Sequence, residues 1–126
     1  MTGPARKILI VDDEEVIVEI LRRRLERMGF EVSIAHDSTS AVMQIGKTGY
    51  DLVICDAVLQ NGASGFEVLR AAKSSGRAVN FVAMSGYPET DDSVSALMES
   101  GASLFVKKPF SSLGGVAEKM ASLASR

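Results

Sequence analysis

Acidic side chains follow two short apolar segments of this sequence, and a hydroxyl and a lysine follow two others. Asp12 and Asp13 come directly after the first apolar segment, and Asp56 ends a later one. Ser85 and Lys108 stand at the ends of two further segments. Three carboxylates brought close together repel one another unless a cation joins them. Hard oxygen ligands of this kind suit Mg²⁺, which takes one or two carboxylates and keeps several waters.

A lysine and a hydroxyl beside such a cation can hold the oxygens of a phosphoryl group. With a carboxylate as nucleophile, they complete the set of groups that phosphoryl transfer to an aspartate requires. Single residues have ordinary alternatives, because Asp13 could cap the first helix and Ser85 could be a plain loop hydroxyl. The five residues together at segment ends favour one shared site.

The apolar segments themselves predict strands. They are short, continuously apolar and rich in β-branched residues, which is typical of strands buried on both faces of a sheet. The expected strands are residues 8–11, 32–35, 52–55, 81–84 and 104–106. Apolar residues at helical spacing follow every strand and predict five helices. These residues are Val16, Ile17, Ile20, Leu21, Leu25 and Met28; Ala41, Val42 and Ile45; Phe66, Val68, Leu69 and Ala72; Val94, Leu97 and Met98; and Val116, Met120, Leu123 and Ala124.

Capping residues and glycines mark the helix ends. Ser38 is expected to cap the second helix, and Gly29 and Gly101 are expected to end the first and the fourth. The glycines at 114–115 should weaken the start of the fifth helix.

Five strands alternating with five helices predict an α/β fold, a doubly wound five-stranded parallel sheet with helices on both faces. In such sheets, sites form outside the carboxyl ends of the strands, which is where the acidic, hydroxyl and lysine side chains stand. The 126 residues fit a single domain, residues 1–126, in which residues 1–6 are expected to be a flexible N-terminus.

Composition argues against several other classes of protein. Apolar residues make up 46% and charged residues 24% of the chain, as in a folded globular protein. The net charge of −2 gives no electrostatic reason to expect nucleic-acid binding. The single cysteine, Cys55, suits a reducing compartment. The sequence has neither a long apolar span nor an apolar signal-peptide core, so the expected location is the cytoplasm.

Four stretches carry a resemblance to a known family. They are residues 7–14 (KILIVDDE), 50–56 (YDLVICD), 84–86 (MSG) and 101–110 (GASLFVKKPF). At these spacings the chain resembles, over essentially its whole length, the receiver domains of two-component response regulators. The resemblance implies a flavodoxin-like strand order of 2-1-3-4-5. It also implies a phosphorelay switch that a histidine kinase or a histidine phosphotransfer protein phosphorylates, and that catalyses only its own phosphorylation and dephosphorylation.

The resemblance assigns roles to individual residues. It implies that Asp56 is the phosphorylated nucleophile and that Asp12 and Asp13 hold Mg²⁺ together with Asp56. The backbone carbonyl of Val58 is expected to complete the protein ligands. Lys108 is expected to pair with the acceptor carboxylate first and with the phosphoryl group afterwards.

The resemblance also implies how the switch works. Ser85 matches the hydroxyl that closes onto a phosphoryl oxygen, and Phe105 matches the aromatic switch residue, which is often tyrosine in relatives. A cis peptide bond between Lys108 and Pro109 is expected to aim the lysine into the crevice. A downstream protein or a second copy is expected to dock on the face built by the fourth helix, the fifth strand and the fifth helix.

One loop departs from the family pattern. Relatives usually carry a proline four residues after the acceptor and a glycine eight residues after it. Those positions are Gln60 and Ser64 here, and the nearest glycine is Gly65. The loop 58–65 is therefore expected to be one residue longer than in relatives and, without its proline, more mobile.

Three other functions share parts of this pattern. An FMN-binding flavodoxin needs a phosphate loop rich in Ser, Thr and Gly after its first strand, and the acidic residues 12–15 would repel a phosphate there. A phosphohydrolase with an aspartyl nucleophile would carry Asp-x-Asp after that strand. Here Asp12 and Asp13 are adjacent and the expected acceptor is on the third strand, which is a different layout. A pseudo-receiver, used only for binding, usually lacks an acidic residue or the lysine, and this chain has both. The sequence leaves open a stand-alone regulator or a piece of a larger one.

Overall fold

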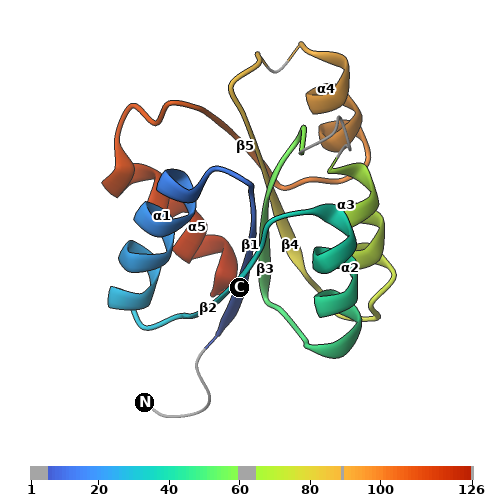
Figure 1. Cartoon of the computed structure of the whole chain (residues 1–126), viewed down its shortest axis with the longest axis horizontal. Helices are drawn as coiled ribbons and strands as arrows, with labels where there is room; N and C mark the ends of the chain where they lie inside the picture. Colours follow the sequence, from blue (N-terminus) through green and yellow to red (C-terminus); the bar gives the residue numbers. More distant parts are fainter. Residues whose placement is uncertain (1–5, 60–64, 89, 126) are drawn as a thin grey trace.

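The computed structural model describes residues 6–59, 65–88 and 90–125, in which five strands alternate with five helices (Figure 1). The strands are β1 (Lys7–Val11), β2 (Glu31–Ala35), β3 (Leu52–Asp56), β4 (Asn80–Ser85) and β5 (Leu104–Lys107). The helices are α1 (Glu15–Arg27), α2 (Ser38–Lys47), α3 (Phe66–Lys73), α4 (Asp92–Glu99) and α5 (Leu113–Ala124). Each strand extends at most one residue beyond the expected range at either end.

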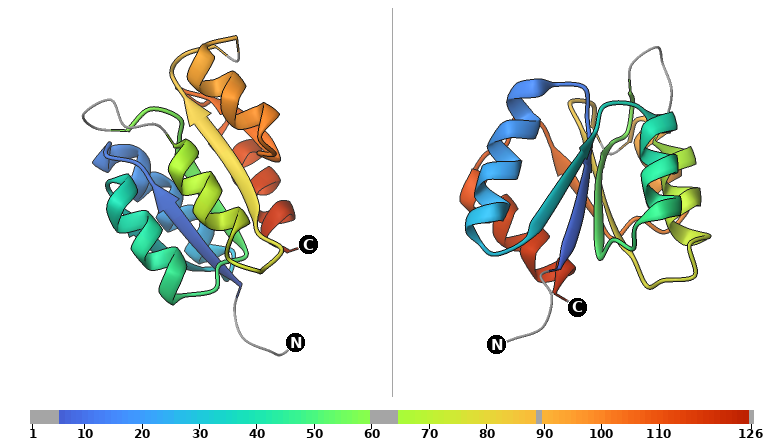
Figure 2. Two further views of the ribbon diagram at one scale, coloured as in Figure 1. Left: turned by 90° about the vertical axis from the view of Figure 1, so that its right-hand side faces the viewer. Right: turned by 60° about the horizontal axis from the view of Figure 1, so that its bottom comes forward.

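The strands form one parallel sheet in the order β2-β1-β3-β4-β5, as expected. Helices α1 and α5 cover one face of this sheet, and α2, α3 and α4 cover the other (Figures 1 and 2). Alternate residues of a strand point to opposite faces. In β1, accordingly, Leu9 packs with the core under α2–α4, whereas Ile8 and Ile10 pack with the core under α1 and α5.

Burial on both faces explains why the strand segments are continuously apolar. All five residues of β3 are buried, and so are five of the six in β4. The edge strands differ from the sequence prediction. Strand β2 buries only Ala35 fully, and β5 buries only Val106, because an edge strand has a neighbour on one side alone.

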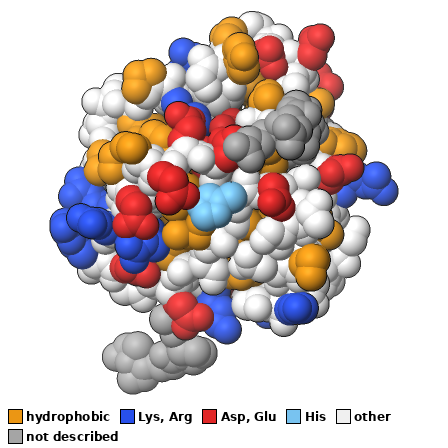
Figure 3. Space-filling view, in the orientation of Figure 1, with side chains coloured by type: hydrophobic (Ala, Val, Ile, Leu, Met, Phe, Trp, Pro, Cys, Tyr) orange, Lys and Arg blue, Asp and Glu red, His pale blue; other side chains and the backbone are white. Residues whose placement is uncertain are grey.

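The inward face of α1 corrects the sequence prediction. The buried residues are Val18, Leu21 and Leu25, at the spacing i, i+3, i+7. Val16 is 70% exposed, and Ile20 and Met28 are also exposed; Figure 3 shows apolar side chains at the surface in this region. Residues 16–18 are all apolar, so the sequence allowed two phases for the helix, and packing on the sheet selects the phase with Val18 inside.

The start of α2 differs from expectation, and the start of α5 carries a side-chain cap that the sequence analysis did not predict. The N-cap of α2 is Asp37, whose side chain accepts a hydrogen bond from the backbone N–H of Ser40 at 2.7 Å; Ser38 is already inside the helix. Helix α5 contains both glycines of its first turn, and the hydroxyl of Ser112 accepts a hydrogen bond from the N–H of Gly115 at 3.1 Å. A side-chain cap of this kind offsets the low helix propensity of glycine.

Two helix ends follow the sequence prediction. Gly29 has φ +98° and Gly101 has φ +113°, a left-handed conformation that other residues adopt at a cost.

The N-terminal segment is tied to the sheet earlier than expected. The carbonyl of Arg6 accepts a hydrogen bond from the N–H of Glu31 at 2.9 Å, and its guanidinium lies 3.5 Å from Asp51. Residues 1–5 of the expected flexible terminus lie outside the described residues. No helix in the described part of the chain combines the length and apolar character needed to cross a membrane.

Candidate functional site

The side chains singled out in the sequence meet at the carboxyl edge of the sheet. The parallel register aligns the strand ends, since Asp56 pairs with Met84 across β3 and β4, and Ser85 pairs with Lys107 across β4 and β5. Asp12 follows β1 and Lys108 follows β5 at the same edge. The predicted convergence of four chain segments on one site is therefore present in the structure.

Three carboxylates form the centre of this site. One oxygen each from Asp12, Asp13 and Asp56 lies within 4.8 Å of the other two. Asp12 is fully buried, Asp56 is 8% exposed, and Asp13 is partly exposed. The N–H of Glu14 donates to Asp12 Oδ1 at 2.9 Å, and the N–H of Val58 donates to Asp56 Oδ1 at 3.2 Å. These bonds hold the acids in place.

The electrostatics of the carboxylates favour a cation between them. Burial raises the pKa of Asp12, and the charge of Asp56 raises it further, although a backbone hydrogen bond from Glu14 and the charge of Lys108 oppose the shift. Burial also raises the pKa of Asp56, with Lys108 opposing and Asp13 adding to the shift. A buried oxygen cluster that resists ionisation without a counter-charge has the chemistry of a hard divalent metal site.

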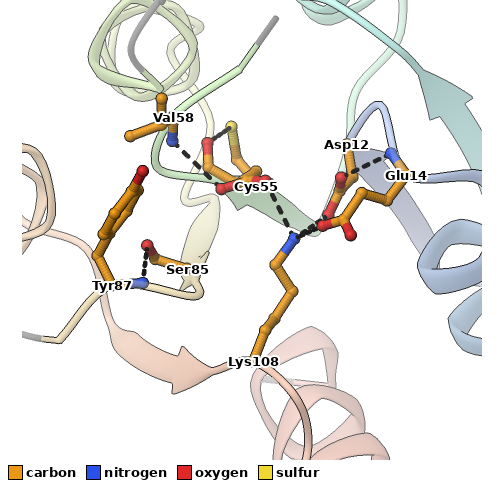
Figure 4. Close-up of polar contacts among 8 residues, drawn as sticks. Asp12, Glu14, Cys55, Val58, Ser85, Tyr87 and Lys108 are labelled. Carbon is orange, nitrogen blue, oxygen red and sulfur yellow. Dashed lines mark hydrogen bonds and ion pairs between the residues drawn. The ribbon is translucent and has the colours of Figure 1, made fainter.

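Lys108 lies among the acids (Figure 4). Its Nζ is 3.1 Å from Asp12 Oδ2 and 3.1 Å from Asp56 Oδ2, and it also contacts Glu14 Oε1. Burial would lower the pKa of Lys108, but the hydrogen bond that Lys108 donates to Glu14 and the charges of Asp12 and Asp56 outweigh burial and raise the pKa above its usual value. The lysine therefore stays charged at neutral pH.

The backbone around Lys108 matches the expected register of the last strand. Lys107 is exposed whereas Lys108 is buried, so the second of the two lysines enters the site. The Lys108–Pro109 peptide bond is cis, as the resemblance implied. The N–H of Lys108 donates to the carbonyl of Ser85 at 2.8 Å, which joins the end of β5 to the end of β4.

An open pocket of about 560 Å³ gives access to these groups. Ser85 lines it, is 1% exposed, and accepts a hydrogen bond through Oγ from the N–H of Tyr87 at 2.9 Å. Val58 also lines the pocket, and its backbone carbonyl is the metal ligand that the resemblance implied. The full lining is Glu14, Ile17, Asp56, Val58, Ser85, Gly86, Tyr87, Lys108 and Pro109.

Two of these lining residues had no role in the sequence prediction. Glu14 reaches Lys108, and Tyr87 lies beside Ser85 and donates its backbone N–H to Ser85 Oγ (Figure 4). Their positions in the sequence could have indicated that they line the site. Glu14 comes two residues after Asp12, and Tyr87 comes two residues after Ser85, at the same edge of the sheet.

Phe105 lies outside the pocket, on β5. It pairs with Ala83 of β4 and packs, partly buried, against the core that includes Val94 and Leu97 of α4. Phe105 also lines a surface groove with Lys119 of α5. The expected switch residue thus touches both the core and the surface.

Gly65 is constrained by the end of β3. A Cβ at this position would lie 2.8 Å from the carbonyl oxygen of Asp56. The N–H of Gly65 donates to the carbonyl of Ala57 at 2.8 Å. The close approach supports Gly65 as the glycine that ends the loop. Gln60 and Ser64, on which the mobility prediction depends, lie outside the described residues.

The sequence matches the family model of the response regulator receiver domain over residues 8–116. The chain belongs to this family. The receiver domain is 38% identical over 109 residues to the phosphate regulon transcriptional regulatory protein PhoB of Escherichia coli, covering 85% of this chain and 47% of PhoB. The chain spans less than half of the length of several such curated relatives.

Solved structures share the fold. A CheY-like response regulator receiver domain from Methanospirillum hungatei has a TM-score of 0.85 and 25% identity, covering 97% of this chain and 95% of that one. A response regulator from Burkholderia pseudomallei, described with a phosphorylated aspartic acid, a calcium ion and citrate, has a TM-score of 0.80 and 24% identity, covering 95% and 69%. A receiver domain is the signalling switch of a response regulator, and the cluster of Asp12, Asp13 and Asp56 offers the oxygen ligands that a divalent metal takes.

Proposed function

We propose that this receiver domain accepts a phosphoryl group on Asp56 in a Mg²⁺-dependent reaction. The proposal rests on the environment of Asp56. Its carboxylate lies in the open pocket, beside two further acids and 3.1 Å from Lys108 Nζ. The oxygen set of Asp12, Asp13 and Asp56 fits Mg²⁺, and we assign the carbonyl of Val58 as a further ligand. Bound Mg²⁺ would neutralise charge on the acids and the phosphoryl oxygens.

The residues of the chain divide the chemistry between them. A carboxylate oxygen of Asp56 forms the new O–P bond while the bond from phosphorus to the donor breaks, and the donor leaves with that electron pair. Lys108 supplies positive charge to the phosphoryl oxygens, and Ser85 supplies a hydroxyl that can donate to one of them. The donor is a phosphohistidine of a kinase or phosphotransfer protein. Apart from this self-phosphorylation and its reversal by water, we assign no enzymatic activity.

The output of the switch follows from Ser85 and Phe105. When Ser85 closes onto a phosphoryl oxygen it vacates space behind β4, and Phe105, already in contact with the core, can turn further inward to fill it. The face of α4, β5 and α5 then changes shape for a downstream protein or a second copy. A local charge thereby shifts a two-state packing element. We place the domain in the cytoplasm on the strength of its family and its unpaired Cys55.

Phosphorylation with acetyl phosphate tests the proposal. Intact-mass spectrometry should detect one added phosphoryl group with Mg²⁺ and none with EDTA, and Asp56→Asn should abolish the labelling. Labelling that persists in Asp56→Asn would contradict the assignment of the acceptor. Absence of labelling in the wild-type domain, with Mg²⁺ bound, would favour a pseudo-receiver that works by binding alone.

A further inference from the structure

Lys108 is surrounded by three carboxylates, and one of them, Glu14, has no part in the function proposed above. Glu14 Oε1 contacts Lys108 Nζ, while Asp12 Oδ2 and Asp56 Oδ2 each lie 3.1 Å from the same nitrogen. An ammonium group has three N–H donors, so these three acceptors occupy all of them. A phosphoryl oxygen can bind Lys108 only if one of the three carboxylates gives up its place.

Asp56 can release the lysine once its own carboxylate carries the phosphoryl group. Before that bond forms, exposure to solvent identifies the carboxylate that can leave. The side chain of Asp12 is 0% exposed and that of Asp56 is 11% exposed, whereas that of Glu14 is 58% exposed. Asp12 is held further by the N–H of Glu14. A carboxylate that leaves a lysine needs water in exchange, and Glu14 is the one already in contact with solvent.

The position of Glu14 in the chain supports a role directed at the lysine. Glu14 is the N-cap residue of α1, yet its side chain makes no capping hydrogen bond. Its backbone is fixed to Asp12, and its side chain lines the same pocket as Asp56 and Ser85. The side chain thus stands at the entrance that a phosphoryl group must use.

We propose that Glu14 is a positioning residue that holds Lys108 in the unphosphorylated domain and yields it to the phosphoryl oxygen. The inference rests on the proposed function, because it needs a phosphoryl group in this pocket. Glu14 competes with that group for the lysine and adds a negative charge at the entrance. The carboxylate therefore opposes phosphoryl binding and keeps the lysine pointed at Asp56 until a donor arrives.

Glu15 offers a matched control. It is the next residue, it carries the same charge, and its side chain is 72% exposed, but it pairs with His36 at 2.6 Å instead of with Lys108. Glu14→Gln and Glu15→Gln each remove one negative charge from the start of α1. An effect of Glu14 through Lys108 appears in the first variant alone, whereas a general effect of charge appears in both.

The first measurement is binding of beryllofluoride, a phosphoryl analogue, in the presence of Mg²⁺, followed by amide chemical shifts. We expect Glu14→Gln to bind the analogue about fivefold more tightly than the wild type, which corresponds to the usual contribution of an ion pair with one well-exposed partner. Glu15→Gln should bind the analogue as tightly as the wild type does. Equal affinity of Glu14→Gln and wild type, or an equal gain in both variants, would overturn the inference. No binding to the wild-type domain would overturn the proposed function itself.

The second measurement needs neither analogue nor metal. Proton–nitrogen spectra of lysine ammonium groups, with the Lys108 signal assigned by its loss in Lys108→Arg, report how fast its protons exchange with water. The exchange should be faster in Glu14→Gln than in the wild type and in Glu15→Gln. Unchanged exchange in Glu14→Gln would show that Glu14 does not hold the lysine in solution and would overturn the inference even if the proposed function stands.

Discussion

Replacing Gly65 by alanine tests how tightly the loop after β3 is coupled to the acceptor. A Cβ on Gly65 would lie 2.8 Å from the carbonyl oxygen of Asp56 and 3.1 Å from Sγ of Cys55. The carbonyl belongs to the last residue of β3, so it can move only if the acceptor residue moves with it. We expect Gly65→Ala to lower the free energy of unfolding by about 1–3 kcal/mol, the usual cost of overpacking. Mg²⁺ binding should weaken in the same variant.

Gly46 provides the matched substitution. It lies in α2, is exposed, and a Cβ there would have no neighbour within 4 Å. Alanine is favoured over glycine inside a helix by about 0.5–1 kcal/mol. Gly46→Ala should therefore stabilise the domain, and the same added methyl group should give effects of opposite sign at the two positions.

Urea unfolding followed by circular dichroism, in EDTA, measures both effects. With a slope of about 2 kcal/mol per molar urea, the midpoint should fall by about 1 M in Gly65→Ala and rise by about 0.3 M in Gly46→Ala. Isothermal titration with Mg²⁺ supplies the second readout. A Gly65→Ala variant as stable as the wild type, with unchanged Mg²⁺ affinity, would refute the coupling between the loop and Asp56.

Three further predictions concern the charged site and one helix end. Lys108→Met removes the ammonium that Asp12 and Asp56 share. Urea curves in EDTA should therefore show that the free energy of unfolding falls by about 3 kcal/mol, the low end for breaking a buried ion pair. Mg²⁺ should restore part of this stability. The raised pKa of Asp56 means that the native state binds this proton more tightly than the unfolded chain. The metal-free wild type should therefore lose stability relative to Asp56→Asn as pH rises from about 4 through the folded pKa, and parallel pH profiles would contradict this. Ser112→Ala should cost about 1 kcal/mol in thermal or urea unfolding, because the hydroxyl caps Gly115.

The sheet and the convergence of the site could be predicted because they depend on coarse patterns. Buried strands such as β3 must be apolar at every position, and β3 is buried throughout. In a parallel sheet all carboxyl ends lie on one edge, so residues that follow strands, such as Asp12 and Lys108, must come together. These conclusions need neither side-chain directions nor exact boundaries.

The errors concern choices between neighbouring residues of similar chemistry. Val16 and Val18 are equally apolar, and only packing on the sheet decided which of them is buried. Asp37 and Ser38 are both good capping residues, and the backbone conformation decided for Asp37. Glu14 was missed because its partner Lys108 lies 94 residues away, and spacing along the sequence cannot select one carboxylate among four consecutive acids.

The long separations within the site have a consequence for when the protein can work. Lys108 is 52 residues from Asp56 and 96 from Asp12 along the chain. The pocket is lined by residues at or just after the ends of four strands, β1, β3, β4 and β5. A nascent chain cannot assemble this site before residue 108 has left the ribosome and β5 has joined the sheet. Competence to bind metal and phosphoryl group therefore requires that β5 has been synthesised and has joined the sheet, and a chain that ends anywhere before β5 lacks the lysine of the site.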